Sequence, residues 1–416
     1  MNDQKFANTL LINLSIVLIV PFLIWGPFFP DLIVVIVTLF FSYYVIKKKL
    51  YYYFNNIPLK IFFLFCVVAV ISSIFAKDIL FSLKSSIFYF RIGIFTCFIW
   101  YLIDKDRIIL SYFYYALILC FTVLTIDGYY QYFNGKNLFG FEIVGTRISS
   151  FFGDEMIMGS YLSRLFPLLF ALFLIKKKKT NEIYFIGLLF ILVDILIYLS
   201  GERTAFFYLN LSTIFIIILI KDYKKFRLIT FTIALFCVFI ISLNSSKLTN
   251  RMILEPLNDM GFIENSKDVT IFSPTHDSMI KTAFNMFLDK PLLGHGPKMF
   301  RKLCSQKKYA VGFPSCSTHP HNFYVQLLAE TGIIGVSFLL ILFFYIFYCC
   351  YKHIKSIIFK QERYLTDYQI CLLSCLLITT WPFAPNGNFF NNWLMIVYSL
   401  PIGFYLQSIY SRKKSD

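Results

Sequence analysis

The sequence predicts an all-α integral membrane protein with about twelve transmembrane helices and one large loop. Hydrophobic residues make up 58% of the 416 residues, which is more than a soluble domain carries. They form long runs without charges, such as 10–24, 32–46 and 206–220, and several runs approach the roughly 18–20 residues that a spanning helix needs. A dozen such runs cannot be buried in one soluble domain of this length.

The hydrophobic runs divide the chain into twelve candidate spans. They cover residues 8–29, 31–46, 58–76, 80–103, 108–132, 157–175, 182–200, 204–220, 228–243, 324–350, 367–384 and 391–409. The first begins with little positive charge and no small-residue cleavage site, so we interpret it as a spanning helix and not a signal peptide. Residues 1–243 therefore hold nine spans, 244–323 form the loop, and 324–416 hold three spans and a tail.

Basic residues indicate which side of the membrane each connection faces. Most of them lie before the first span or at the end of every second span, and these are Lys5, Lys47–Lys49, Lys60, Lys105, Arg107, Lys176–Lys179, Lys221, Lys224, Lys225, Arg227, Lys352, Lys355, Lys360, Arg363 and Arg412–Lys414. The other short connections hold few. This bias predicts cytoplasmic termini and a periplasmic loop in a bacterial inner membrane. The net charge of +16 is thus a topology signal, and we expect no nucleic-acid partner.

The loop contains one predicted amphipathic helix. Ser273 is its expected N-cap and Pro274 its first residue. An apolar face would lie against the membrane or cap the bundle, and it consists of Met279, Ile280, Ala283, Phe284 and Phe287. Residues 292–297, which include Gly294, His295 and Gly296, end this helix.

Two of the ten cysteines, Cys304 and Cys316, lie in the polar loop, whereas the other eight lie in or beside apolar runs. In an oxidising compartment this pair is expected to form a disulfide. Metal binding together with the loop histidines is the alternative, but the spacing fits no standard zinc pattern, so we expect no metal site.

Histidines gather where the loop enters the tenth span, in the segment His319-Pro320-His321-Asn322. Pro320 favours an extended residue before it and a helix start after it. His321 would then lie at a helix N-terminus, where free backbone N–H groups favour phosphate. Its imidazole would donate to a diphosphate or accept a proton from a hydroxyl. The alternative is that both histidines only hydrogen-bond the helix cap.

Arginines near the outer membrane face form a second signal. Arg147 and Arg203 follow outer breaks in the chain, and the planar guanidinium suits a diphosphate. Arg203 has the alternatives of pairing with Glu202 or Glu330, or of snorkelling to headgroups. Arg164 is expected to pair with Asp154 or Glu155 in a structural role, and Arg91 is unassigned. Asp268 and Asp277 are possible carboxylate bases without a partner pattern. The chain has no glycine-rich phosphate loop, and we identify no Asp-x-Asp pair of the kind that holds a metal-bound nucleotide sugar, so we expect no cofactor.

These motifs resemble the bacterial O-antigen ligase and O-antigen polymerase superfamily. His321-Asn322 followed by Gly332 is similar to its histidine signature, and the turn around Gly294 is similar to its glycine turn. Residues 200–203 and the segment from Thr146-Arg147 to Gly153 resemble its arginine-containing outer segments. The resemblance spans roughly residues 147–335.

The resemblance implies a glycosyltransferase C-like membrane enzyme that needs no metal. It implies transfer of a glycan from undecaprenyl diphosphate to an acceptor hydroxyl, either on lipid A-core (ligase) or on a second lipid-linked glycan (polymerase). It assigns catalysis to His321 and diphosphate binding to Arg203 and Arg147, with His319, Asn322, Gly294 and Gly332 in support. A further arginine is usual in the long loop. His276 stands where we would expect it, and Arg251 and Lys281 are the other candidates.

Two other classes of protein compete with the enzyme. A transporter or flippase would place polar residues near the middle of many spans. Here they gather at the outer face and in the loop, which favours an enzyme. A structural membrane scaffold would leave the histidines and arginines unexplained.

Overall fold

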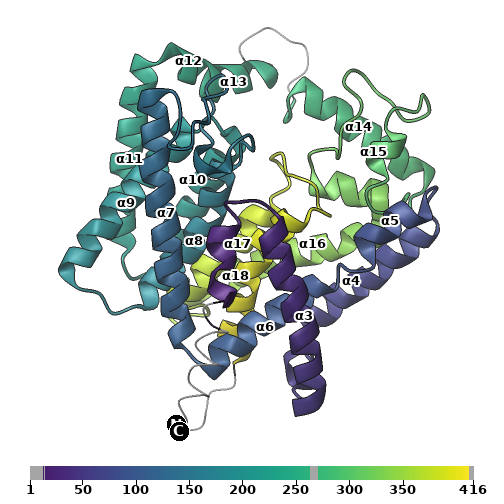
Figure 1. Cartoon of the computed structure of the whole chain (residues 1–416), viewed down its shortest axis with the longest axis horizontal. Coiled ribbons are helices and arrows are strands. Elements are labelled where there is room, and N and C mark those ends of the chain that lie inside the picture. Colours follow the sequence, from purple (N-terminus) through teal and green to yellow (C-terminus); the bar gives the residue numbers. More distant parts are fainter. Residues whose placement is uncertain (1–12, 14, 263–269, 412–416) are drawn as a thin grey trace.

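The computed structural model describes residue 13 and residues 15–262 and 270–411. Helices carry the whole described architecture, which contains no β-strand apart from isolated bridges in the turn 136–147. Figure 1 shows these helices as one bundle, with the short helices of the large loop at one end. The long helices are α3 (Phe28–Lys48), α4 (Ile57–Ile74), α6 (Arg91–Lys105), α7 (Ile108–Asn134), α8 (Met158–Ile175), α9 (Thr180–Leu199), α10 (Arg203–Leu219), α11 (Lys224–Asn244), α16 (Phe323–Ile358), α17 (Asp367–Thr380) and α18 (Asn392–Tyr410).

Nine helical segments of the described chain are long and apolar enough to cross a membrane, so the protein is a multi-pass α-helical membrane protein. One of the nine combines α5 (Ile79–Ser86) with α6, and α10 and α17 are shorter apolar helices. Each predicted span from the second to the twelfth overlaps at least one of these helices. The first predicted span begins outside the described residues and ends beyond α2 (Ile19–Phe22), and Lys5 and Arg412–Lys414 also lie outside them. The count of twelve and the side of each terminus stay predictions.

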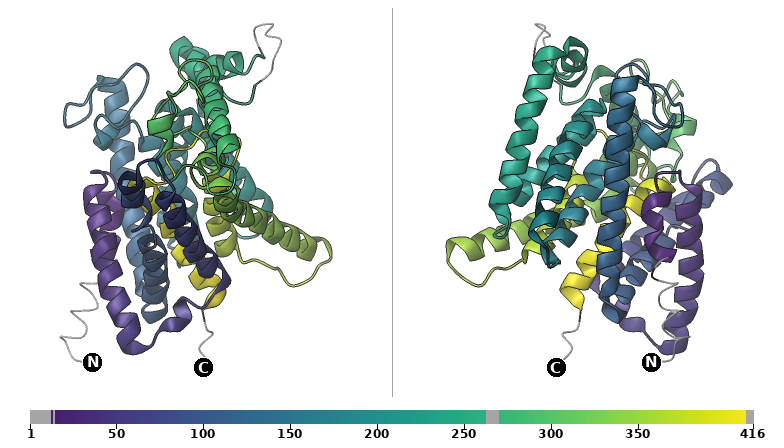
Figure 2. Two further views of the ribbon diagram at one scale, coloured as in Figure 1. Left: turned by 90° about the vertical axis from the view of Figure 1, so that its right-hand side faces the viewer. Right: turned by 60° about the vertical axis from the view of Figure 1, so that its left-hand side comes forward.

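The bundle is organised around α8. This helix packs against α7, α9, α10, α17 and α18, and most of its side chains are buried. The outer helices α3, α11 and α16 leave broad apolar faces exposed, as lipid-facing helices do. Figure 2 shows the C-terminal part of α16, in yellow-green, projecting from the bundle. Helix α8 is therefore the most buried of the nine segments.

Helix α16 is broken at Gly332, although the sequence predicted one continuous span over 324–350. Gly332 has φ 65° and ψ −168°, outside the helical region. The backbone groups freed by this break pair with the turn around Gly294. His295 and Gly296 donate their N–H groups to the carbonyls of Ala329 and Glu330 at 2.9 and 2.8 Å. In return, Ile333 donates to the carbonyl of Pro291 at 2.8 Å.

Only glycine fits where these two segments cross. A Cβ atom on Gly332 would lie 2.2 Å from the carbonyl oxygen of Leu292, and one on Gly294 would lie 2.5 Å from the carbonyl carbon of Glu330. Both residues also have positive φ, which side chains disfavour. The pair of glycines therefore fastens the large loop to α16 by direct backbone contact.

The large loop contains the predicted helix, α14 (Pro274–Asp289), preceded by Ser273 at the N-cap. Its buried face differs from the prediction. Met279 and Ala283 are buried as expected, but Phe284 is 46% exposed, and Met286 is buried instead. The buried face differs because α14 packs against α16 and the small core around α15 (Phe300–Leu303).

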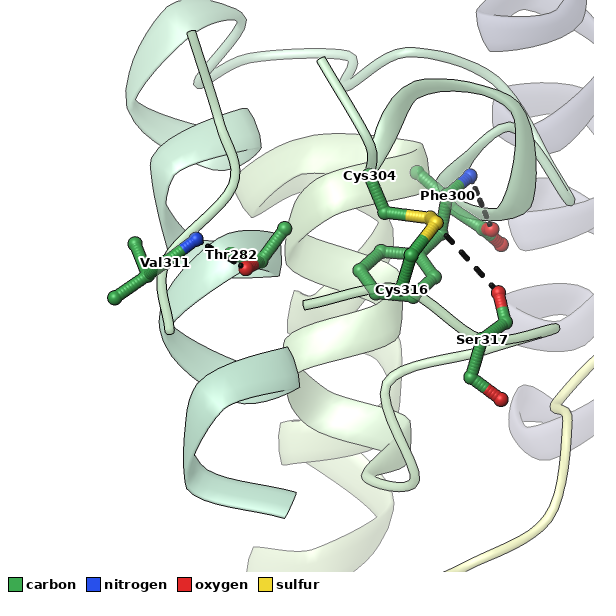
Figure 3. Close-up of a disulfide and its surroundings, with 7 residues drawn as sticks. Thr282, Phe300, Cys304, Val311, Cys316 and Ser317 are labelled. Atoms are coloured by element: carbon green, nitrogen blue, oxygen red, sulfur yellow. Dashed lines mark hydrogen bonds between the residues drawn. A yellow bond between two sulfur atoms is a disulfide. The ribbon is translucent and has the colours of Figure 1, made fainter. Parts of the chain in front are cut away.

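A disulfide joins Cys304 to Cys316 beside this small core, as the sequence predicted (Figure 3). The other eight cysteines are free, and most are buried. The loop also contains α12 (Ser246–Thr249), the π-helical turn η3 (Asn250–Leu254) and α13 (Glu255–Asp259). Asp268 lies outside the described residues.

Candidate functional site

A cavity of about 1260 Å³ opens at the end of the bundle that carries the large loop. Its walls come from the connections α2–α3, α7–α8, α9–α10 and α17–α18 and from the loop itself. Twelve alternating spans would put all of these connections on the same side, opposite the basic clusters. A smaller cavity, lined by the connections α6–α7 and α16–α17, lies at the other end.

The cavity contains most of the predicted site residues. His321, His319, His276, Arg147, Arg203 and Arg251 all line it. Lys281 does not line it, because its ammonium group pairs with Asp277 one helical turn away on α14, at 2.6 Å. Of the three candidates for the loop contact, the structure therefore brings His276 and Arg251 to the cavity and leaves Lys281 outside.

Arg203 and Arg251 tie the loop to the break between α9 and α10. The Nε of Arg203 donates to the carbonyl of Arg251 at 2.7 Å, and the Nε of Arg251 donates to the carbonyl of Gly201 at 3.0 Å. The guanidinium of Arg203 pairs with Glu255 and lies 3.6 Å from Asp259. The predicted alternatives, ion pairs of Arg203 with Glu202 or Glu330, are therefore wrong, because α13 supplies its acidic partners.

Gly201 allows Arg147 to lie close to Arg251 at the break between α9 and α10. It has φ 68°, and a Cβ there would lie 3.1 Å from the carbonyl of Thr146, 3.2 Å from Nε of Arg251 and 3.4 Å from Cγ of Arg147. Burial, and then the charges of Arg203 and Arg147, lower the pKa of Arg251. Three guanidinium groups thus repel one another at the cavity wall, an arrangement that an anion would stabilise.

The hydrogen bonds of Glu202 go to the start of α8. Its carboxylate accepts from the N–H groups of Gly159 and Ser160 at 2.6 and 3.0 Å and from the Ser160 hydroxyl at 2.8 Å. Burial raises its pKa to about 7, against the lowering effect of these hydrogen bonds and of Arg147. Glu202 therefore satisfies the free N–H groups of a helix start from outside that helix.

His321 lies immediately before α16, where its position was predicted. Asn322 is the N-cap, and its side chain accepts from the N–H groups of Tyr324 and Val325 at 3.0 and 3.2 Å. His321 itself has φ 55°, a conformation uncommon for a residue with a side chain. Its backbone is fixed because Asn386 donates its N–H to the His321 carbonyl at 2.8 Å.

The ring of His321 hydrogen-bonds to no other part of the described chain and lines the cavity. The ring of His319, 4.1 Å away between centroids, is fully engaged: its Nε2 donates to the Asn386 carbonyl at 3.2 Å and its Nδ1 accepts from Thr318. The pKa of His321 is lowered to about 4 by burial and by His276. His319 supports the segment, while neutral His321 remains free to accept a proton.

His276 completes the histidine group. Its ring centroid is 5.0 Å from that of His321, and its Nδ1 hydrogen-bonds the hydroxyl of Ser273 at 3.0 Å. Burial lowers its pKa, with Asp259 acting against this and Arg203 adding to it. Within the described residues no group of three or more His, Cys, Asp or Glu side chains has a geometry that could hold a metal ion.

Other cavity residues were missed or misassigned from the sequence. Arg164 was expected to pair with Asp154 or Glu155, and this is wrong: its side chain lies between Tyr208 and Tyr398 and donates to Asn386. Arg91, unassigned before, pairs with Asp31 at 2.6 Å. Arg301, Asn386 and Asn388 also line the cavity and were not predicted. The cluster of four asparagines in 386–392 was the one available signal for that segment.

The charge of the lining favours anions. Five arginines face three carboxylates across it: Arg147, Arg164, Arg203, Arg251 and Arg301 against Asp154, Glu155 and Glu202. Positive groups in a partly enclosed cavity of low dielectric attract an anion more strongly than the same groups in water.

One family model matches part of the chain. No curated protein matches the chain. The family model described as O-Antigen ligase matches residues 186–340, which include the break at 200–203, the large loop and the histidine segment. Over residues 186–340 the chain is therefore similar to the O-antigen ligase family.

Proposed function

We propose that the cavity is the active site of an O-antigen ligase-type glycosyltransferase. The acceptor hydroxyl oxygen forms a bond to the anomeric carbon of the donor glycan, and the bond from that carbon to the diphosphate oxygen breaks. The products are the new glycoside and undecaprenyl diphosphate, and the hydroxyl proton passes to His321. The acceptor is a sugar hydroxyl of lipid A-core, and the reaction takes place on the periplasmic side of the inner membrane.

The observation that carries this proposal is the convergence of three arginines and one unpartnered histidine on a single cavity. Negative charge grows on the diphosphate as its bond to the glycan breaks. Arg147, Arg203 and Arg251 are held by backbone contacts before the reaction, so they stabilise that charge without reorganising.

His321 suits the role of general base. Its low pKa keeps the imidazole neutral near pH 7, so a ring nitrogen is available for the proton of the hydroxyl, but a base of such low pKa accepts a proton weakly until a negative group lies beside it. As the diphosphate leaves, its negative charge stabilises the imidazolium that forms. This reaction uses side chains of the protein alone, and we expect transfer to persist in EDTA.

The decisive experiment is a transfer assay with the full chain in lipid nanodiscs. It receives undecaprenyl-diphosphate glycan with or without lipid A-core, and with or without EDTA. Transfer that requires lipid A-core supports the ligase, whereas chain growth without lipid A-core would identify a polymerase. No transfer to either acceptor from any donor would refute both.

The His321→Ala variant tests the site within the same assay. We expect its transfer rate to fall by on the order of 100-fold or more, since general-base contributions are typically 10²–10⁴-fold. Lys281→Gln is the matched control, because it removes a loop charge that lies outside the cavity. Full activity of His321→Ala would remove His321 from the mechanism.

A further inference from the structure

Arg164 is the most deeply buried cation of the cavity. It lies on α8, and its residue is 6% exposed. Its guanidinium carbon is 4.6 Å from the ring centroid of Tyr208 on α10 and 4.5 Å from that of Tyr398 on α18. The two rings hold the guanidinium between them by cation–π contacts.

The polar partners of Arg164 are incomplete. Its Nη2 donates to Oδ1 of Asn386 at 3.4 Å, and the same oxygen accepts from the Tyr208 hydroxyl at 2.8 Å. Its Nη1 has no hydrogen-bond partner, and neither does the hydroxyl of Tyr398. No carboxylate of the described chain lies within ion-pair distance of this guanidinium.

A buried cation without an anionic partner is costly, and a chain that retains one has a use for it. The other deeply buried arginine shows the usual solution. Arg227 pairs with Asp194 at 2.8 Å between α9 and α11. Arg164 instead presents its free donor in a lined cavity, so its missing partner is expected to be a ligand.

That ligand group is distinct from the diphosphate of the proposed function. Tyr208 follows Arg203 by five residues along α10, which is about 7 Å of helix. Arg164 follows Gly159, the residue that contacts Glu202, by five residues along α8, again about 7 Å. The niche therefore lies deeper in the bundle than the three arginines at the rim. A cavity of about 1260 Å³ exceeds the roughly 300–1,000 Å³ of common ligand pockets, which leaves room for sugars as well.

We propose that Arg164, Tyr398 and Asn386 form a second anion subsite that binds a carboxylate or phosphate substituent of a glycan substrate. This inference rests on the proposed function, since it places the acidic sugar next to the reacting carbon. The link is Asn386, whose side chain contacts Arg164 and whose backbone N–H fixes the carbonyl of His321. An acidic group on the glycan would thus be bound beside the proposed base.

Binding tests the subsite without requiring transfer. The full chain in nanodiscs is titrated with methyl glucuronide and with methyl glucoside, and binding is measured by calorimetry. We expect the glucuronide to bind more tightly than the glucoside, and Arg164→Gln to weaken glucuronide binding by roughly tenfold or more. Tyr398→Phe keeps the ring and removes only the hydroxyl, so a smaller loss is expected. Arg203→Gln is the matched control and should retain glucuronide binding.

Equal glucuronide binding by the parent protein and Arg164→Gln would overturn the proposal, as would a loss caused by Arg203→Gln alone. Arg164→Lys keeps the charge and serves if Arg164→Gln fails to elute as a single species in size-exclusion chromatography. Because lysine lacks the planar fork of arginine, weaker binding of glucuronide but not of glucoside by Arg164→Lys supports the subsite. Equal glucuronide binding by Arg164→Lys and the parent protein would overturn it.

Transfer then identifies which substrate carries the anion. Donors with a neutral or a uronic-acid sugar next to the diphosphate are combined with neutral or phosphorylated acceptors. Arg164→Gln should lower kcat/KM for one acidic substrate by at least tenfold relative to its neutral counterpart, and that substrate is the source. An equal loss for all combinations would show a structural role and overturn the proposal. If the parent protein transfers nothing, the proposed function fails, while the glucuronide titration still decides the subsite.

Discussion

Replacing Arg203 by glutamine tests whether the arginines at the cavity rim act on the diphosphate or only hold the loop. In the structure Arg203 holds the loop, since it donates to the Arg251 carbonyl and pairs with Glu255, and the diphosphate contact is the proposed second role. Its side chain is 32% exposed and that of Glu255 is 45% exposed. Ion pairs with such exposure typically contribute about 0–1 kcal/mol, so their loss alone changes the folded fraction little.

Loss of a transition-state contact is larger. Removing one preorganised donor to a developing anion costs about 10²–10³ in kcat, or roughly 3–4 kcal/mol. We therefore expect Arg203→Gln to lower kcat/KM for transfer at least 100-fold. Glu255→Gln breaks the same ion pair but leaves the guanidinium in place, so it should remain within about threefold of the parent protein.

Both variants are measured in nanodiscs with the lipid-diphosphate donor at concentrations below its KM, together with their thermal unfolding midpoints. An Arg203→Gln protein within threefold of the parent would refute a diphosphate role for Arg203. Equal large losses in the two variants would show that the docking of α13, and not the charge of Arg203, limits transfer.

Three further perturbations follow from the site. Because burial keeps the pKa of His321 near 4, the neutral base persists on acidification, and kcat/KM should not fall between pH 6.5 and 5; a fall centred near 6.5 would contradict this. Burial raises the pKa of Glu202 to about 7 from an ordinary 4.5. A raised pKa stabilises the fold by up to about 3 kcal/mol below about pH 4.5, where the carboxyl group is protonated. This stabilisation is lost as the pH rises to about 7. Glu202→Gln should remove that dependence from unfolding midpoints measured at pH 5 and 8; an unchanged slope would assign it to other groups. Gly332→Ala should abolish transfer and lower the unfolding midpoint, because its Cβ would lie 2.2 Å from the Leu292 oxygen. Gly135→Ala, which also has positive φ but meets nothing within 4 Å, should cost only the backbone strain of about 1–2 kcal/mol, and equal effects of the two would refute the docking argument.

The helices were largely predictable because hydropathy is a local property. Long hydrophobic runs locate eleven of the predicted spans, since a helix that faces lipid must satisfy its backbone internally whatever its neighbours are. Breaks within the predicted helices were less predictable. The predicted span 80–103 contains two helices, α5 and α6, separated by a turn at 87–90, and no proline or glycine marks that turn. The break at Gly332 depends on Leu292 and its neighbours, which lie forty residues earlier in the chain.

Side-chain partners were the least predictable part of the site. Local sequence suggested that Arg203 pairs with Glu202, but Glu202 caps α8 and α13 supplies the partners. Arg227 was counted among the charges of a cytoplasmic connection, yet it is buried against Asp194. In both cases the outcome depends on how distant segments pack, and a single sequence carries no record of those distances.

Polar groups of this cavity that have hydrogen-bond partners hold its walls in place, whereas those without partners are available to bind a ligand. The backbone of His321, the ring of His319 and the side chain of Asn322 all have partners, and so they fix the segment that carries the proposed base. Nε of Arg147 and of Arg301, Nη1 of Arg164 and the hydroxyl of Tyr398 have none, although all four residues line the cavity.

Each of these four groups can donate a hydrogen bond, and three carry positive charge. Buried donors without partners cost roughly 1–3 kcal/mol each, and a ligand rich in negatively charged oxygens would offset this cost when it binds in the cavity. A diphosphate at the rim and an acidic sugar in the deeper niche would together supply such oxygens. Because a neutral acceptor analogue brings no negative charge to these donors, we expect it to bind weakly by itself. We expect it to bind more tightly once the diphosphate donor is present.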